Sequence, residues 1–325
     1  MYNSRMKIHF PHGAFLGNID QFLMAFDPTD PQHLSITSVE KWMWVHPIVL
    51  CMTASLALTV DRKNIRCQRI KTKSGHYLER MGLFNFLGIK SGMKISEHDP
   101  SGRFIPITQI RNSKELTTFI TEMVPMLHLK PGQAEPIRYI VSELVRNVLE
   151  HSEAKNGAFL CAQYFKTSNI IRLGIADTGI GIRKSLSQSH TTSDDKEAIK
   201  LALMPGVTGT TLREGGTEQN AGAGLFFIKS IAYTSRNFLV IYSGSAMYKL
   251  LKKKNSEGLI LHANPDIDRH SDRNDLPVWN GTVVGIDISL ESTNEFTELL
   301  DLIRTTYSNA VRERRKKRFK EAKFI

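Results

Sequence analysis

The chain has 325 residues, of which 41% are hydrophobic and 23% are charged, and these values describe an ordinary globular protein. The length suggests two domains that each bury a core, and it excludes a disulfide-dependent mini-protein. The three cysteines, Cys51, Cys67 and Cys161, lie far apart and lack the spacing of a zinc site. A reducing cytoplasm is therefore the expected compartment.

The net charge of +11 is concentrated at the C-terminal end. Residues 311–323, VRERRKKRFKEAK, hold eight Lys and Arg against two Glu, so they supply +6 of that charge. The rest of the chain is only mildly basic, which argues against a fold built on nucleic acid. The longest apolar run, residues 45–60, is shorter than the roughly 20 residues that span a bilayer, so no membrane contact is expected.

The first hundred residues predict a small α/β domain. Residues 47–60 are apolar nearly all round, with Pro47 at a permitted first-turn position, and they predict a core helix packed against a sheet. Residues 100–110, PSGRFIPITQI, are rich in Pro and Gly and predict a boundary, which gives a first domain of residues 1–110. The other expected elements are a strand and loop in residues 7–27, a strand at residues 64–71 and a short amphipathic helix at residues 74–89.

Residues 111–292 predict a layer of helices on a mixed, mostly antiparallel sheet. The pattern predicts a helix over residues 135–152, then a hairpin of two strands at residues 157–166 and 170–177. Residues 183–221 are rich in Gly, Thr, Ser and charge, and they predict a long lid with one helical piece. The remaining expected elements are a helix at residues 115–127, a glycine-led helix at 222–236, strands at 237–244, 246–253, 258–263 and 281–290, and a C-terminal helix with a basic tail at 293–325.

The segment SELVRNVLEHS carries the first chemical pattern. Glu143 and Asn147 are four residues apart, so they project from one helix face. An amide oxygen together with phosphate oxygens and water can hold Mg²⁺, and Glu143 could then accept the proton of an attacking hydroxyl or water. An isolated Glu and Asn at this spacing is more often a solvated polar face.

The segment IADTGIGI follows an apolar strand. Asp177 could accept the exocyclic amino hydrogens of adenine, and Gly179 and Gly181 permit the close approach of a ligand. An ordinary turn is the plain alternative, because this motif is only moderately specific.

Two further segments complete the pattern. In GGTEQNAGAGLFFIK, Gly222 and Gly224 stand where a helix begins, so free backbone N–H groups and the helix dipole could receive phosphate, although a flexible joint fits equally well. In NGTVVGIDI, Thr282 opens a strand and could hydrogen-bond a base directly or through water. By itself this is most often a plain strand start.

The order of these segments is more specific than any one of them. Over residues 115–290 it resembles the ATP-binding superfamily of gyrase, the heat-shock chaperone, histidine kinases and MutL, and VSELVRNVLEHSE is most similar to the anti-sigma-factor serine kinases. The resemblance implies a Bergerat-type α/β sandwich with ATP and Mg²⁺ as cofactors. It also implies site roles: Glu143 as catalytic base, Asn147 on the metal, Asp177, Gly179, Gly181 and Thr282 around adenine, and Gly222, Gly224 and Leu225 at the phosphate lid.

Two departures from the family pattern stand out. The lid is longer than anti-sigma kinases usually carry, and the cations expected near the phosphates are few, with Arg213 the main candidate and Lys229 a second. His151 is expected to cap or pack near its helix end, because no dimerising helix pair with a phosphorylatable His is visible.

The first domain, through residues 77–89, resembles STAS-like domains, although a generic α/β helix with an aromatic face explains the same residues about as well.

These patterns leave three functional hypotheses. The first is a protein serine/threonine kinase or slow ATPase in regulatory signal transduction, the second is a non-catalytic ATP switch that changes which partner protein is held, and the third is an ATP-gated nucleic-acid protein. The third, in which the basic tail would bind nucleic acid, is disfavoured, because the resemblance implies a transducer domain after the ATP module and only about 35 residues follow it. A regulatory protein partner is expected, and the oligomeric state stays open, with a homodimer as one option.

Overall fold

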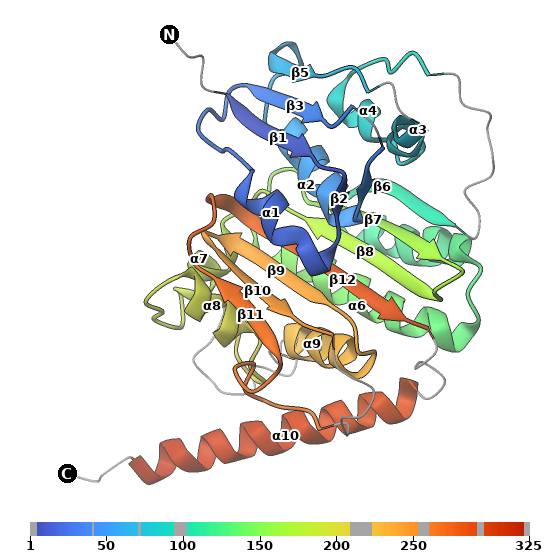
Figure 1. Cartoon of the computed structure of the whole chain (residues 1–325). Helices are drawn as coiled ribbons and strands as arrows, with labels where there is room; N and C mark the ends of the chain where they lie inside the picture. The colour runs from blue at the N-terminus through green and yellow to red at the C-terminus, as the bar shows by residue number, and fades with distance from the viewer. Residues whose placement is uncertain are drawn as a thin grey trace.

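A seven-stranded sheet runs through the middle of the molecule, in the order β11-β10-β9-β12-β8-β7-β6, and every pairing in it is antiparallel (Figure 1). The computed structural model describes residues 5–40, 42–70, 73–93, 103–208, 223–252, 260–290 and 296–321. The strands of this sheet are β6 (Phe104–Ile110), β7 (Ala158–Phe165), β8 (Ile170–Ala176), β9 (Leu239–Gly244), β10 (Ala246–Leu250), β11 (His270–Arg273) and β12 (Trp279–Ser289).

The predicted hairpin is confirmed, since β7 and β8 pair in antiparallel register from Phe159 with Ala176 to Phe165 with Ile170. The strand expected at residues 258–263 is wrong in its described part, because residues 260–263 form no strand and β11 lies further along the chain. Both faces of the sheet are buried: Leu160 and Ala162 pack on the helix side, while Phe159 and Cys161 pack on the opposite side. The alternation follows from the two-residue period of a strand.

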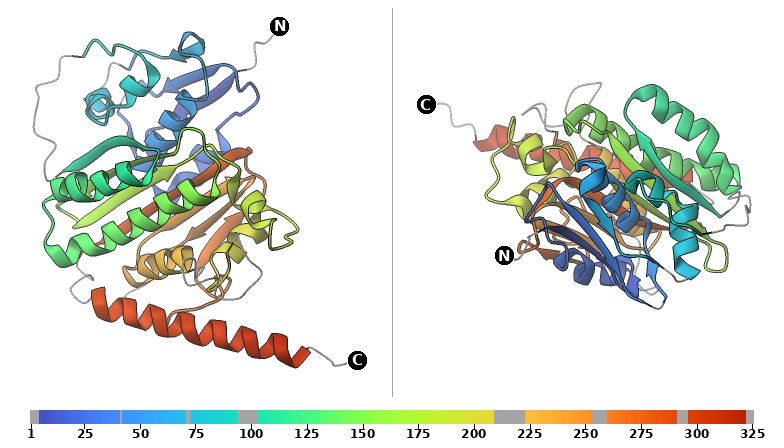
Figure 2. Two further views of the ribbon diagram at one scale, coloured as in Figure 1. Left: turned by 180° about the vertical axis from the view of Figure 1, so that it is seen from behind. Right: turned by 90° about the horizontal axis from the view of Figure 1, so that it is seen from above.

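Helices cover one face of the sheet, as expected (Figure 2). The longest of them, α6 (Pro131–His151), begins four residues earlier than predicted, because Pro131 occupies the first turn and Pro136 is accommodated inside the helix. The other helical segments of this layer are α5 (Ser113–Thr118), η3 (Phe119–Met123), η4 (Val124–Leu127), α7 (Gly181–Leu186), α8 (Asp195–Ala202) and α9 (Gly224–Thr234).

Much of the stretch expected to be a lid is folded against the sheet. The predicted helical piece is confirmed as α8, and its first residue, Asp195, accepts hydrogen bonds from the backbone and side chain of Ser245 between β9 and β10. Near the other end of α8, Lys200 forms ion pairs with Asp266 and Asp272. The sequence-predicted lid therefore includes α8 and the end of α7, which contacts β9 and β12, and its residues 209–221 lie outside the described part.

An N-terminal unit, residues 5–93, lies on the opposite face of the large sheet. It contains a parallel three-stranded sheet in the order β1-β3-β5 and a short parallel pair, β2 with β4. Its elements are β1 (Met6–Phe10), β2 (Gly13–Ala14), η1 (Leu16–Asn18), α1 (Ile19–Met24), β3 (Leu34–Ser38), β4 (Trp44–Val45), α2 (Pro47–Ala57), η2 (Arg62–Asn64), β5 (Ile65–Cys67), α3 (Lys73–Arg80) and α4 (Leu83–Leu87).

The N-terminal unit is packed onto the large sheet through α2, whose residues are all buried. This helix contacts β7 and β8, so the sheet that the sequence predicted beneath it is the large one. Polar contacts accompany the packing: the His46 imidazole bonds the Asp287 carboxylate at 3.1 Å, and Lys249 forms an ion pair with Asp20. The strand β6, expected at the domain boundary, forms an edge of the large sheet. The division at residue 110 stays a prediction.

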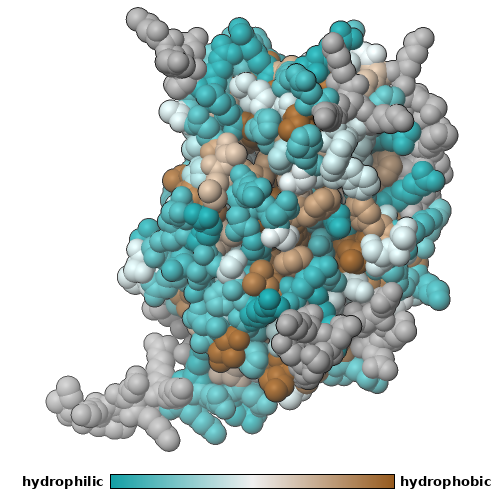
Figure 3. All heavy atoms as spheres, viewed as in Figure 1, coloured by the Kyte–Doolittle hydropathy of each residue, from teal (hydrophilic) through white to brown (hydrophobic). Residues whose placement is uncertain are grey.

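The last described element is the long helix α10 (Phe296–Glu321), which crosses below α6 and α9 and extends past the body (Figures 1 and 2). No helix in the described part of the chain is long and apolar enough to span a membrane. On the face shown in Figure 3, hydrophobic residues form small groups separated by hydrophilic ones.

Candidate functional site

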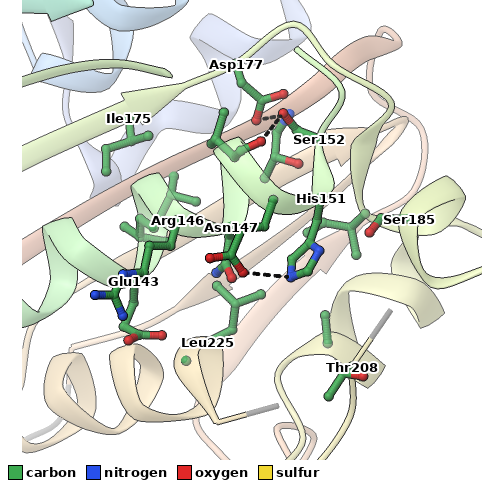
Figure 4. A pocket seen from close by; sticks show the side chains of 18 of the residues that line it. Glu143, Arg146, Asn147, His151, Ser152, Ile175, Asp177, Ser185, Thr208 and Leu225 are labelled. Carbon is green, nitrogen blue, oxygen red and sulfur yellow. Dashed lines mark hydrogen bonds and ion pairs between the residues drawn. The ribbon is translucent and has the colours of Figure 1, made fainter. Parts of the chain in front are cut away.

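One pocket of about 350 Å³ opens on the helical side of the sheet, within the size range of small-molecule sites (Figure 4). Its walls come from α6, the end of β8, α7, the start of α9 and the start of β12. Gly179 lies in the loop after β8 without lining the pocket, and Gly222 lies outside the described residues. The other sequence-predicted residues all line it: Glu143, Asn147, Asp177, Gly181, Gly224, Leu225 and Thr282.

The helix α6 supplies a row of polar side chains. Glu143, Asn147 and His151 follow one another along it at four-residue intervals, which places them on one face (Figure 4). Glu143 is half-buried, and this burial raises the pKa of its carboxyl, with a smaller upward contribution from Glu150 and an opposing one from Arg146. A carboxylate with a raised pKa is a better proton acceptor, so this residue suits a general base.

The start of α9 faces this row. Ala223, Gly224 and Leu225 line the pocket, so the first turn of the helix, with backbone N–H groups that have no partner inside the helix, borders the cavity beside Glu143. The positive end of a helix dipole and free N–H groups favour an anion. This end of the pocket can therefore accept phosphate.

Asp177 lies toward the other end of the pocket and is 1% exposed. Its carboxylate accepts hydrogen bonds from the backbone N–H of Gly179 at 2.8 Å and of Thr282 at 3.2 Å. Burial outweighs these two bonds and raises the pKa of Asp177 to about 7. A buried carboxylate held in place by main-chain donors is suited to recognising a hydrogen-bond donor on a ligand.

The loop after Asp177 is tied to the rest of the pocket wall. The backbone N–H of Ile180 donates to the Ser152 carbonyl at 2.7 Å, which joins the loop to the end of α6. Gly181 has a φ of 77°, a left-handed conformation that favours glycine, and it begins α7 at the pocket wall. The backbone conformation at this point of the pocket wall therefore favours glycine.

The sequence reasoning missed several lining residues. Arg146 lies one turn from Glu143 on α6, and it is the single Lys or Arg among the described lining residues. The spacing of three residues makes Arg146 a neighbour of Glu143 on the helix surface, and this could be read from the sequence. Ser185 and Thr208, on α7 and just before residue 209, had no such signal. The remaining wall is largely apolar: Leu144, Val148, Ile175, Ile182, Leu186, Val207 and Val284.

Lys229, the second cation that the sequence suggested for the phosphates, points away from the pocket. Its side chain is 2% exposed, and its ammonium group forms an ion pair with Asp268 at 2.5 Å and donates to the His262 carbonyl. That suggestion is wrong, because this face of α9 packs on residues 260–268. Arg213, the first candidate, lies outside the described residues. His151 ends α6, lines the pocket and lies 3.9 Å from the Glu150 carboxylate, and its expected capping or packing role stays a prediction.

Among the described residues, no group of three or more His, Cys, Asp or Glu side chains could hold a metal ion. The pocket instead offers the amide of Asn147, with the carboxylate of Glu143 one turn away on the same face of α6. Such a donor set fits a Mg²⁺ ion that keeps water and phosphate oxygens as its other ligands. A scan of the chain against protein-family models finds no match, and a search of curated proteins finds none either.

Proposed function

We propose that this chain binds Mg²⁺ and ATP in the pocket and acts as a serine/threonine protein kinase of the anti-sigma type or as a slow ATPase in cytoplasmic regulation. One observation carries the proposal: Glu143, Asn147, Asp177, Gly224 and Thr282, spread over 140 residues of sequence, line one cavity. A chance set of polar residues would not be expected to meet in this way. The proposal rests on this convergence and on the resemblance in segment order.

Adenine is assigned to the Asp177 end. The ionised carboxylate can accept the exocyclic amino hydrogens of adenine, whereas guanine carries a carbonyl oxygen at the corresponding position. Apolar side chains such as Ile175 and Val284 nearby suit the faces of a purine ring. Thr282 is assigned a double role, since its backbone N–H holds the carboxylate while its hydroxyl, which lies 3.5 Å from Ser243 Oγ, would bond the base or a bridging water.

The phosphates are assigned to the end formed by α6 and α9. Asn147 would hold Mg²⁺, which would neutralise phosphate charge during transfer. The N-terminal turn of α9 would receive phosphate oxygens through its N–H groups, and Arg146 adds one positive charge to the described wall. Gly222 and residues 209–221 are assigned to the lid by the resemblance alone.

The reaction assigned to Glu143 is proton removal. As the oxygen of a serine or threonine hydroxyl, or of water, forms a bond to the γ-phosphorus, its proton passes to the Glu143 carboxylate, and the bond to the ADP oxygen breaks. ADP leaves with the electron pair of that bond. The raised pKa of Glu143, caused by its burial, favours this transfer.

A labelling experiment tests the assignment. The purified chain is incubated with Mg²⁺ and ATP labelled at the γ-phosphate, alone and with candidate acceptor proteins, and the label is followed into free phosphate or onto protein. Glu143→Gln should abolish transfer while nucleotide binding remains, and Glu135→Gln, the same change at an exposed position of α6, should leave both unchanged. Undiminished turnover in Glu143→Gln would refute the role of this residue.

A non-catalytic switch is the second candidate. The described lining contains one Lys or Arg, a small number for stabilising phosphoryl transfer, and the N-terminal unit is packed on the same sheet that carries Asp177. In this reading ATP binding changes which regulatory protein the N-terminal unit holds, and that unit is assigned the STAS-like role suggested by its sequence. Binding of ATP without any release or transfer of label would favour the switch over the enzyme.

A further inference from the structure

A buried tryptophan connects the pocket to the N-terminal unit. Trp279 is the first residue of β12 and is 2% exposed. Its indole N–H donates a hydrogen bond of 3.0 Å to the backbone carbonyl of Asp177. Because Trp279 does not line the pocket, it can act on a ligand only through Asp177.

The hydrogen bond from Trp279 completes a set that fixes Asp177. The backbone N–H of Asp177 donates to the Thr282 carbonyl at 2.9 Å, and its carboxylate accepts from the backbone N–H groups of Gly179 and Thr282. The backbone N–H of Asp177 is thus bonded to the main chain of β12, and its backbone carbonyl is bonded to the indole of Trp279. Removing the indole N–H would leave a buried carbonyl unpaired, which is costly enough to shift the loop.

The other side of the indole belongs to the N-terminal unit. Phe26, which follows α1 and is 4% exposed, has its ring centroid 5.7 Å from that of Trp279. Tyr242 of β9 packs on the same indole at 6.3 Å, and its hydroxyl donates to the Pro277 carbonyl. The position of the indole is therefore set jointly by the large sheet and by Phe26.

We propose that Trp279 is a positioning residue for recognition of the adenine base, and that the N-terminal unit acts on the nucleotide site through the contact between Phe26 and Trp279. This inference rests on the proposed function, because it concerns the same pocket. It adds a route by which a partner bound to the N-terminal unit could change base recognition without touching the pocket. The shared element is the indole, which packs on Phe26 and bonds the residue assigned to the base.

The first test is the variant Trp279→Phe, which keeps a ring for packing and removes the N–H. Its affinity for ATP should fall about fivefold, as expected for loss of one buried hydrogen bond, and its preference for ATP over GTP should shrink. Tyr242→Phe is the matched control, because it loses a hydrogen bond in the same cluster but does not bond Asp177. Equal discrimination in wild type and Trp279→Phe would overturn the inference.

A second measurement avoids any loss of stability at Trp279. The chain has three tryptophans, so Trp42→Phe with Trp44→Phe leaves Trp279 as the only one. Its emission should change on addition of ATP and follow the binding curve. In this background Phe26→Leu should reduce the emission change, whereas Phe10→Leu, the same change within the small sheet, should not. Emission that stays constant while calorimetry records binding would overturn the inference.

The proposed function and the role of Trp279 can fail separately. If wild type shows no calorimetric binding of ATP with Mg²⁺, the proposed function falls and this inference falls with it. A second outcome is that wild type binds ATP while Trp279→Phe keeps its base preference, Trp279 emission does not follow binding and Phe26→Leu behaves like Phe10→Leu. In that case the proposed function stands and only the role of Trp279 is lost.

Discussion

The carboxylate of Glu143 lies against the first residue of α9, so closely that a Cβ atom on Gly224 would be 2.6 Å from Glu143 Oε2. The residue assigned as proton acceptor thus borders the helix end assigned to phosphate. Only a glycine at position 224 leaves the carboxylate its present space. The clashing atom is the end of a flexible side chain, so a larger residue would move the Glu143 carboxylate and leave the backbone in place.

Gly224→Ala should therefore fold normally and lose activity. Displacing a catalytic carboxylate by about 1 Å can cost roughly a hundredfold in rate, and we expect label transfer from ATP to fall by about that factor. Gly13→Ala is the control, since a Cβ there meets only Phe15 at an ordinary 3.9 Å. The idea fails if Gly224→Ala turns over ATP at the wild-type rate with its melting temperature unchanged.

Binding of the base should depend on the ionisation of Asp177. Its pKa is raised to about 7 by burial, and the protonated form accepts hydrogen bonds from an amino group poorly. Adenosine, which carries no phosphate, should bind more tightly as pH rises, with about a tenfold loss for each pH unit below the pKa. Calorimetry between about pH 5.5 and about pH 8 measures this dependence.

Asp177→Asn serves as the comparison for that titration. Its adenosine affinity should be weak and independent of pH, and a wild-type affinity that is also flat with pH would contradict the assignment. The shift has a stability consequence as well: between the unfolded value near 4 and about 7 the native state holds a proton that the unfolded chain has released. The free energy of unfolding should therefore fall as pH rises through this window, and less so in Asp177→Asn.

Lys229 should matter for stability and not for nucleotide. Replacing it with Met leaves the Asp268 carboxylate buried without its ion-pair partner, a change that costs about 3–5 kcal/mol in comparable buried pairs. Urea unfolding measures the loss, and the double variant Lys229→Met with Asp268→Leu should recover part of it. A Lys229→Met protein that keeps its stability but loses ATP binding would contradict this prediction and support a role of Lys229 in binding phosphate.

The N-terminal unit should be required for folding of the rest of the chain. It covers one face of the large sheet, where Phe159, Cys161 and Tyr242 would otherwise be exposed to water. Residues 103–325 produced alone should aggregate or lack a cooperative thermal transition. Co-expression with residues 1–93 should restore a complex that purifies as one species. A soluble, cooperatively folding fragment would contradict this and support the predicted independence of the two domains.

Local patterns in the sequence determined most of the secondary structure. The apolar run at α2, the four-residue spacing on α6 and the alternation in β7 and β8 depend only on neighbours along the chain, so the period of a helix or strand is readable from them. The same holds for Glu143 and Asn147, whose common face follows from helix geometry alone.

Tertiary structure decided what each buried face meets. An apolar pattern shows that a face is covered but not by what: the apolar run at α2 predicts a sheet beneath the helix, and only the folded chain shows that this is the large sheet. The direction of Lys229 depends on how α9 is rotated against residues 260–268. The bonds that hold Asp177 come from Thr282 and Trp279, over 100 residues away, and only the folded chain brings them together.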